Sequence, residues 1–122
     1  MIDHMTLRVR DYAKSKAFYL AALKPLGYEM IMEWEGFVGL GVKGKPDFWI
    51  APAEDRKYSQ LHIAFRAPNR KAVHEFHDAA LKAGGKDNGG AGPRTEYHPS
   101  YFGAFVLDPD GHNVEACCHD KE

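Results

Sequence analysis

An internal repeat is the feature that most constrains how this chain of 122 residues folds. Residues 3–27 and residues 61–85 align without a gap at an offset of 58 positions. The matched positions include three pairs of identical residues, which are His4 and His62, Arg8 and Arg66, and Phe18 and Phe76. Both segments also contain Ala-Ala-Leu-Lys, and a glycine stands three residues after the lysine in each. Such a repeat indicates two copies of one supersecondary unit, which we expect to meet near residues 56–59.

Each copy is predicted to begin with a strand and to continue with a helix. Apolar residues alternate with polar or small ones over residues 5–9 and 63–66, which is typical of half-buried strands. Asp11 and Asn69 are suitable helix N-caps, because their short side chains accept hydrogen bonds from free amides of the first turn. Gly27 and residues 84–85, both glycine, are expected to end the helices in a left-handed conformation.

Short strands are predicted after each helix. Apolar runs place them at the five ranges 28–32, 37–42, 48–51, 101–107 and 113–118, and a further short strand is expected near 94–97. The sequence Asp-Pro-Asp-Gly at 108–111 predicts a tight turn between the last two strands. The pattern therefore reads βαβββ twice. We expect an α+β fold in which residues 1–122 form one domain of two tandem modules, about 1–57 and 58–122. A curved mixed sheet would surround a concave site, with the helices outside.

Composition excludes several classes of function. Sixteen Lys and Arg against seventeen Asp and Glu give a formal net charge of −1, which gives no reason to expect nucleic acid or a membrane surface as a partner. No apolar run approaches the roughly 20 residues of a membrane-spanning helix, and the first residues do not resemble a signal peptide. Cys117 and Cys118 are adjacent, so they do not form an ordinary disulfide framework. We expect a cytoplasmic protein that acts on a small molecule.

Strand alternation predicts a metal site. His4, His62 and Glu115 fall on the strand faces opposite the apolar ones, and those faces would line the concave surface. Two imidazoles and one carboxylate form a ligand set for a divalent transition metal, and they leave positions open for water or substrate. The repeat strengthens this prediction because His4 and His62 occupy equivalent positions. Otherwise, each of the three residues would simply sit on a polar strand face.

Other residues are candidates for substrate contacts. Arg8 and Arg66 are predicted on the concave face, where they would bind an anionic substrate or form structural ion pairs. Tyr97, His98 and Tyr101 lie at the end of a long polar loop, where lids and substrate contacts are common. A histidine there can act as a general acid or base, although a loop packed on the surface is the simpler interpretation.

The chain resembles the vicinal oxygen chelate superfamily, which includes glyoxalase I, fosfomycin resistance proteins, extradiol dioxygenases and bleomycin resistance proteins. The resemblance covers nearly the whole chain and rests on the paired βαβββ pattern, the ligand strands at 3–9 and 61–65, and the closing hairpin at 105–116. It implies that His4, His62 and Glu115 hold one divalent ion (Zn, Ni, Mn or Fe). It also implies a homodimer. Some members of the superfamily build the concave site across the dimer interface.

The sequence departs from the named activities at several positions. Glyoxalase I has a fourth ligand, Glu or Gln, where this chain has Trp49, whose indole N–H cannot ligate a metal. Trp49 would instead form an apolar wall for the substrate or belong to the core. A set of three ligands together with Thr6 is similar to the site of the fosfomycin resistance thiol transferases. The long polar loop and the C-terminal end of this chain do not match theirs. Extradiol dioxygenases share the ligand triad and bind iron, usually in longer chains.

Two hypotheses follow from the resemblance. In the first, the protein is a metal-dependent lyase or isomerase, or a transferase, acting on a small substrate with two neighbouring oxygens. The metal would stabilise an enolate-like charge, and Glu115, Tyr97 or His98 would carry the proton, with Thr6, Arg8, Trp49, Arg66 and Tyr101 at the substrate. An extradiol-type dioxygenase or a thiol transferase is the alternative within this class. In the second, the protein is a metal-free binding module similar to the bleomycin resistance proteins.

Overall fold

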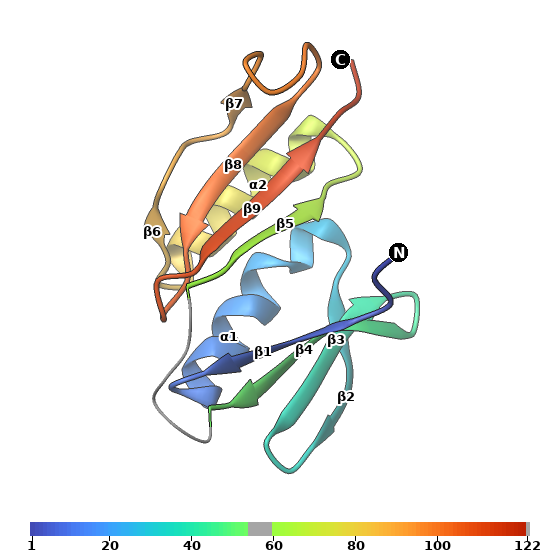
Figure 1. The fold of residues 1–122 in the computed structure, drawn as a ribbon, viewed down its shortest axis with the longest axis vertical. Helices are drawn as coiled ribbons and strands as arrows, with labels where there is room; N and C mark the ends of the chain where they lie inside the picture. Colours follow the sequence, from blue (N-terminus) through green and yellow to red (C-terminus); the bar gives the residue numbers. More distant parts are fainter. Residues whose placement is uncertain (54–59, 122) are drawn as a thin grey trace.

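The computed structural model describes residues 1–53 and 60–121, in which two α-helices pack on two mixed sheets (Figure 1). The elements of the first half are β1 (Met5–Val9), α1 (Tyr12–Ala22), the 3₁₀ turn η1 (Lys24–Leu26), β2 (Glu29–Trp34), β3 (Phe37–Val42) and β4 (Lys45–Pro52). The elements of the second half are β5 (His62–Arg66), α2 (Arg70–Lys82), β6 (Lys86–Asp87), β7 (Gly92–Pro93), β8 (Phe102–Leu107) and β9 (Asn113–Cys118). The predicted module boundary near 56–59 lies outside the described residues.

The two sheets have the same design. The first has the order β1-β4-β3-β2, and the second has the order β5-β9-β8-β6 with β7 also pairing with β8. In each sheet the first and last strands of the module lie side by side in parallel, and the other neighbours are antiparallel. The α+β fold predicted from the repeat is confirmed, with the strands divided between two sheets instead of joined in one.

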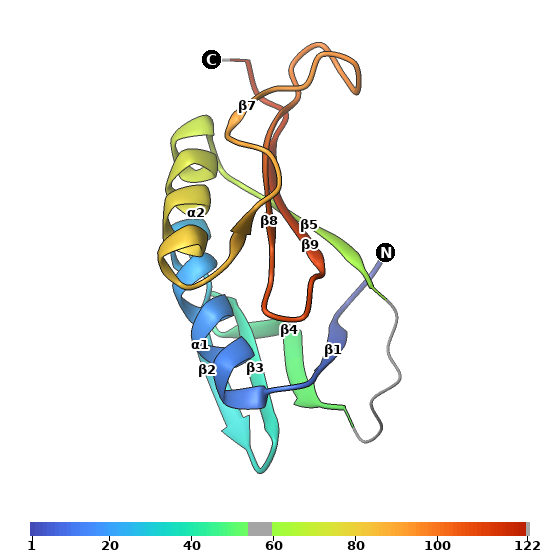
Figure 2. The same cartoon turned by 90° about the vertical axis from the view of Figure 1, so that its left-hand side faces the viewer.

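Both helices cover the same side of the sheets, as Figure 2 shows. Apolar residues of the strands point toward the helices and join buried helix residues from both halves in one hydrophobic cluster. Phe18 of α1 and Phe76 of α2, which are equivalent in the repeat, are both buried in this cluster. The polar side chains that alternate with them therefore lie on the opposite side, which we call the open face.

The predicted helix starts are confirmed, whereas α1 ends at Ala22 and Gly27 ends the 3₁₀ turn that follows it. Asp11 Oδ1 accepts a hydrogen bond from Lys14 N at 3.0 Å, and Asn69 Oδ1 accepts one from Ala72 N at 2.8 Å. Gly27 and Gly84 adopt positive φ values of 91° and 97° after the helical segments. Neither of the two described α-helices is long and apolar enough to cross a membrane.

Strand prediction was less accurate in the long loop. The predicted strand near 94–97 is wrong, because Tyr97 N donates to Arg94 O at 3.0 Å and closes a turn there. Pairing with β8 occurs instead at β7, where a Gly-Pro pair gives no strand signal in the sequence. The strand predicted at 28–32 also extends further, to Trp34.

A buried hydrogen-bond network joins the two modules at the predicted turn 108–111. Tyr19 of α1 donates from its hydroxyl to Asp108 Oδ2 at 2.6 Å, and His112 N donates to Asp108 Oδ1 at 2.8 Å. Gly111 N closes the turn by donating to Asp108 O at 2.9 Å. Because Asp108 is buried, these donors compensate for removing its carboxylate from water.

Candidate metal centre and aromatic pocket

The second sheet brings His62 and Glu115 together on the open face. The parallel pairing of β5 with β9 sets Ala64 opposite Glu115 and His62 opposite Asn113. From these positions His62 Nε2 approaches Glu115 Oε2 to 3.5 Å. The sequence prediction that these two residues share one site is consistent with this geometry.

A backbone carbonyl determines which nitrogen of His62 is available. His62 Nδ1 lies 3.1 Å from Asn113 O, and a carbonyl oxygen only accepts, so Nδ1 carries the hydrogen. In the neutral ring, Nε2 then presents its lone pair toward the carboxylate oxygen of Glu115. Two acceptors that face each other are stabilised by a cation between them. A backbone carbonyl bound to the second ring nitrogen is also the usual support of a metal-ligating histidine.

Glu115 is held from its other side. It is only 2% exposed, and its Oε1 accepts a hydrogen bond from the Tyr101 hydroxyl. Burial and the neighbouring carboxylate raise the pKa of Tyr101 well above its usual value, so the phenol remains a donor at neutral pH. Oε2 is therefore the oxygen that faces His62. Burial also raises the pKa of Cys117, whose neutral thiol lies beside Tyr101.

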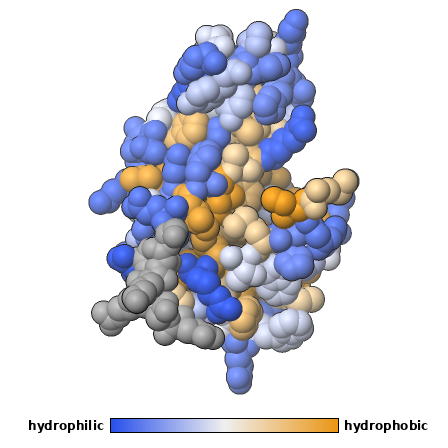
Figure 3. Space-filling view, in the orientation of Figure 1, coloured by the Kyte–Doolittle hydropathy of each residue, from blue (hydrophilic) through white to orange (hydrophobic). Residues whose placement is uncertain are grey.

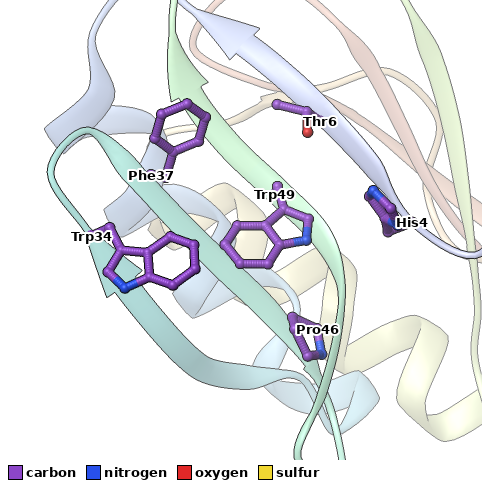
Figure 4. A pocket seen from close by; sticks show the side chains of 6 residues that line it. All are labelled: His4, Thr6, Trp34, Phe37, Pro46 and Trp49. Atoms are coloured by element: carbon purple, nitrogen blue, oxygen red, sulfur yellow. The ribbon is translucent and has the colours of Figure 1, made fainter.

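The first sheet carries a different surface at the equivalent place. His4, Thr6 and Trp49 line a pocket of about 340 Å³ together with Trp34, Phe37 and Pro46 (Figure 4). His4 Nδ1 lies 2.8 Å from Asp3 Oδ1, which leaves Nε2 as the second ring nitrogen available to a ligand. The pocket is thus aromatic, with one imidazole at its edge.

Trp34 and Phe37 are site residues that sequence reasoning missed. The rings of Trp34 and Trp49 are stacked, with centroids 6.1 Å apart and planes 22° apart. A Cβ atom at Gly39 would lie 2.8 Å from the Trp49 ring, so glycine at this position lets the indole lie flat on β3. The available signal was the aromatic pair that flanks Glu-Gly in the β2–β3 turn.

The position of Trp49 explains the missing fourth ligand. Thr6 and Ala64 are equivalent in the repeat, and their parallel partners are Trp49 and Glu115. Trp49 therefore occupies, in the first module, the place that Glu115 occupies in the second. The open face offers one carboxylate at these two positions.

The two predicted arginines lie at the ends of their strands. Arg8 donates from Nη1 to Pro52 O at 3.1 Å and lies over the Phe37 ring, 5.5 Å from its centroid. Arg66 lies opposite Cys117 in the β5–β9 register and lines a groove between the modules. Figure 3 shows apolar side chains gathered on this face between β5 and β1.

Tyr97 and His98 lie at the rim of the second half. Tyr97 is 62% exposed and packs edge-on against Tyr101, with ring centroids 5.2 Å apart. His98 Nδ1 accepts a hydrogen bond from Ser100 N at 3.1 Å, and its ring lies 5.8 Å from that of His119. Within the part of the chain that the structure describes, Tyr101 alone of these loop residues touches Glu115.

One chain does not assemble the predicted triad. Among residues 1–53 and 60–121, no group of three or more His, Cys, Asp or Glu side chains is placed to hold a metal. His62 and Glu115 approach each other on the second sheet, whereas His4 belongs to the pocket of the first sheet. His4 and His62 thus occupy equivalent positions on different sheets, and the sharing of one site by both histidines stays a prediction.

Solved structures of other proteins share this fold. A glyoxalase/bleomycin resistance protein from Albidiferax ferrireducens matches with a TM-score of 0.83 at 23% identity, over 95% of this chain and 97% of that one. A glyoxalase/bleomycin resistance protein/dioxygenase family enzyme from Burkholderia phytofirmans matches with a TM-score of 0.75 at 18% identity, over 98% of both chains. A glyoxalase-related enzyme from Fulvimarina pelagi matches with a TM-score of 0.73 at 17% identity, over 97% of this chain and 87% of that one.

The sequence itself identifies the family. No curated protein matches it significantly. The family profile described as Glyoxalase/Bleomycin resistance protein/Dioxygenase superfamily matches residues 1–116, nearly the whole chain. This match agrees with the repeat, the paired sheets and the resemblance stated above. The chain therefore belongs to the glyoxalase/bleomycin resistance protein/dioxygenase superfamily.

Proposed function

We propose that this protein is a metal-dependent enzyme whose site holds one divalent ion with His62 and Glu115 of one chain and His4 of a second copy. The observation that carries this proposal is the approach of His62 Nε2 to Glu115 Oε2 at 3.5 Å. Each of these atoms is left facing the other because Asn113 O takes the second nitrogen of His62 and Tyr101 takes the second oxygen of Glu115. The donors fit the group, since two imidazoles and one carboxylate suit Zn, Ni, Mn or Fe.

The separation of His4 from His62 and Glu115 supports the involvement of a second copy. His4 lies on the first sheet and near the exposed N-terminus, where Ile2 is 86% exposed. The side chain of His4 is itself 58% exposed, so it is accessible to a second chain. A two-fold homodimer would set the first sheet of one copy against the second sheet of the other, and would form two equal sites.

The side chains of this protein then have separate tasks. A bound divalent ion supplies Lewis-acid stabilisation of negative charge that develops on substrate oxygens, as on an enolate. Tyr101 holds Glu115 Oε1, so that Oε2 keeps its direction. His98 uses Nδ1 to accept from Ser100 N, which makes Nε2 the atom that would exchange a proton at the rim. The aromatic side chains of the pocket would cover one side of a bound substrate and exclude water from that side.

The small number of protein ligands supports the proposed substrate class. Because Trp49 stands in place of a fourth ligand, a bound ion would keep positions for two neighbouring oxygens of a small molecule, and Thr6 and Arg8 would contact the remainder. We propose lyase, isomerase or transferase chemistry on such a substrate. Iron at the site would favour oxygen chemistry of the extradiol type, and manganese would favour transfer of a thiol. The two free cysteines favour a reducing, cytoplasmic location.

A metal-free binding module is the second candidate. It is favoured by the stacked indoles of Trp34 and Trp49, which form a surface for a flat ligand without any metal. It gives no role to the His62 and Glu115 pair, which is why we rank it second.

Metal content decides between the two candidates. Elemental mass spectrometry of the purified protein should find about one equivalent of Zn, Ni, Mn or Fe per chain. His62→Ala and His4→Ala should each lose it, whereas His74→Ala, which changes an exposed histidine on α2, should retain it. Negligible metal that cannot be reconstituted, or metal that persists in both ligand variants, would overturn the metal site and leave the binding module.

A further inference from the structure

The aromatic pocket of the first sheet has a flat and unusually exposed surface. It contains both tryptophans of the chain, and Trp34 is 66% exposed. The stacked indoles of Trp34 and Trp49 present ring faces to the pocket (Figure 4). A flat ring laid on them removes apolar surface from water on both partners and gains from offset stacking. The geometry therefore favours an aromatic ligand.

One cation stands at the far end of this surface. Arg8 lies over the Phe37 ring and donates Nη1 to Pro52 O, which fixes the plane of its guanidinium. Its other N–H groups have no partner among the described residues, and no described carboxylate forms an ion pair with it. A fixed guanidinium with free donors is suited to bind a carboxylate through two parallel hydrogen bonds.

The order of groups along β1 gives the ligand a direction. Arg8 lies four residues beyond His4, which corresponds to roughly 13 Å in extended chain. Figure 4 shows Trp49 between Trp34 and His4, and Phe37 on the side away from His4. A bound molecule thus meets a cation at one end, flat rings in the middle and the imidazole of His4 at the other end.

We propose that the aromatic pocket selects planar aromatic molecules that carry one carboxylate. The carboxylate would bind Arg8, and the ring would lie on Trp34 and Trp49. This inference rests on the proposed function and deepens it, because it names the class of molecule that would bind at the same site. The oxygens that would face the metal lie at the end of the molecule remote from the carboxylate. The aromatic carboxylate is recognised by the first sheet alone, so its binding is measurable without metal.

The test compares an acid with its neutral isostere. Protein treated with chelator is titrated with 2-naphthoate and with 2-naphthamide by calorimetry, and tryptophan emission reports the location because both tryptophans line the pocket. We expect naphthoate to bind about tenfold more tightly than the amide, the effect of one charge-assisted contact. Arg8→Gln should remove this difference and leave the affinity for the amide unchanged.

Control variants separate charge from stacking. Lys71→Gln removes a cation from the exposed surface of α2, away from the pocket, and should change neither affinity. Trp34→Ala should weaken both probes, by about tenfold for the loss of one stacked ring. Arg8→Lys keeps the charge without the planar pair of donors and should retain only part of the preference.

Three results would overturn the inference. They are equal affinity for the acid and the amide, an Arg8→Gln protein that still prefers the acid, and absence of binding because a second copy covers the pocket. The outcome is independent of the metal proposal. Naphthoate binding by a protein that never retains metal would support this inference and contradict the metal-dependent function. Metal retention without naphthoate binding would contradict this inference and support the metal site.

Discussion

The two modules share a chain path but differ in chemistry at their equivalent positions. His4 and His62 correspond in the repeat, yet His62 faces Glu115 whereas His4 faces an aromatic pocket. The difference lies in the parallel partner strand, which supplies Glu115 in β9 and Trp49 in β4. The second module therefore offers a charged, hydrogen-bonded half-site, and the first offers a flat apolar one.

Neither module therefore contains all three proposed metal ligands. The second half has two of the proposed ligands, of which only His62 is a histidine, and the first half has the proposed ligand His4 but no carboxylate at the place equivalent to Glu115. The proposed two-fold dimer would join the first half of one copy to the second half of the other, and would do so twice.

The largest effect is expected from exchanging the residues that distinguish the modules. Glu115→Gln should abolish retained metal, because the neutral amide removes the one anionic ligand. Trp49→Phe changes the equivalent residue of the first module without adding a possible ligand and should leave metal content unchanged. Elemental analysis of both proteins checks this. Equal loss in the two variants would contradict the assigned division of roles.

The helices provide a test in which the modules should behave alike. Phe18 and Phe76 are equivalent and buried, so Phe18→Ala and Phe76→Ala should each lower the free energy of unfolding by about 3–5 kcal/mol. Because both residues belong to one hydrophobic cluster, denaturant should unfold each variant in a single transition. Two separate transitions would show that the modules fold independently.

The support behind Glu115 should have a smaller effect on the metal site. Tyr101→Phe removes the hydrogen bond to Oε1 but keeps the ring, and we expect metal affinity to fall by about 10–100-fold. Tyr97→Phe is the control, since Tyr97 packs on Tyr101 without a described contact to Glu115. A competition titration with a coloured chelator measures both. An unchanged affinity in Tyr101→Phe would remove Tyr101 from the site.

The smallest effect concerns how each helix is tied to an outer strand. In the first module, burial and a 2.7 Å hydrogen bond to Glu33 raise the pKa of Tyr12 to about 12. Because this pKa lies above its unfolded value, the contact stabilises the fold at neutral pH and is lost as pH rises through about 12. In Glu33→Gln the pKa of Tyr12 should fall toward its ordinary value.

The second module makes the corresponding link with His77 Nε2 and Asp87 Oδ1, 3.0 Å apart. A hydrogen bond from Gly89 N and the contact with His77 lower the pKa of Asp87, so this link is lost as pH falls through that lowered value. Ultraviolet titration, with Tyr12→Phe to assign the signal, tests the first module. If Glu33→Gln leaves the titration of Tyr12 unchanged, the contact has no such role.

Local sequence patterns were sufficient for most of the fold. The repeat, the alternation in the strands and the capping side chains of Asp11 and Asn69 predicted the paired modules and their helix starts. The strand near 94–97 failed because Gly-Pro at β7 pairs through tertiary context that local propensity does not contain.

The candidate site was less predictable for a physical reason. Alternation places His4, His62 and Glu115 on the open face, but it does not determine which sheets meet there. Trp34 escaped notice because it lies past the end of the predicted strand, and its role depends on stacking with Trp49 across two strands. Contacts of this kind depend on register and glycine placement, as at Gly39, and not on spacing along the chain.

The most direct measurement is a complementation test between two chains that each lack a different proposed metal ligand. His4→Ala and His62→Ala chains are co-expressed with different tags, and the mixed dimer is isolated by purification on both tags in turn. In that dimer, one site combines the intact His4 of one chain with the intact His62 and Glu115 of the other. We expect about one metal ion per mixed dimer and none in either variant alone. A mixed dimer without metal, or a failure to form dimers at all, would contradict the shared site.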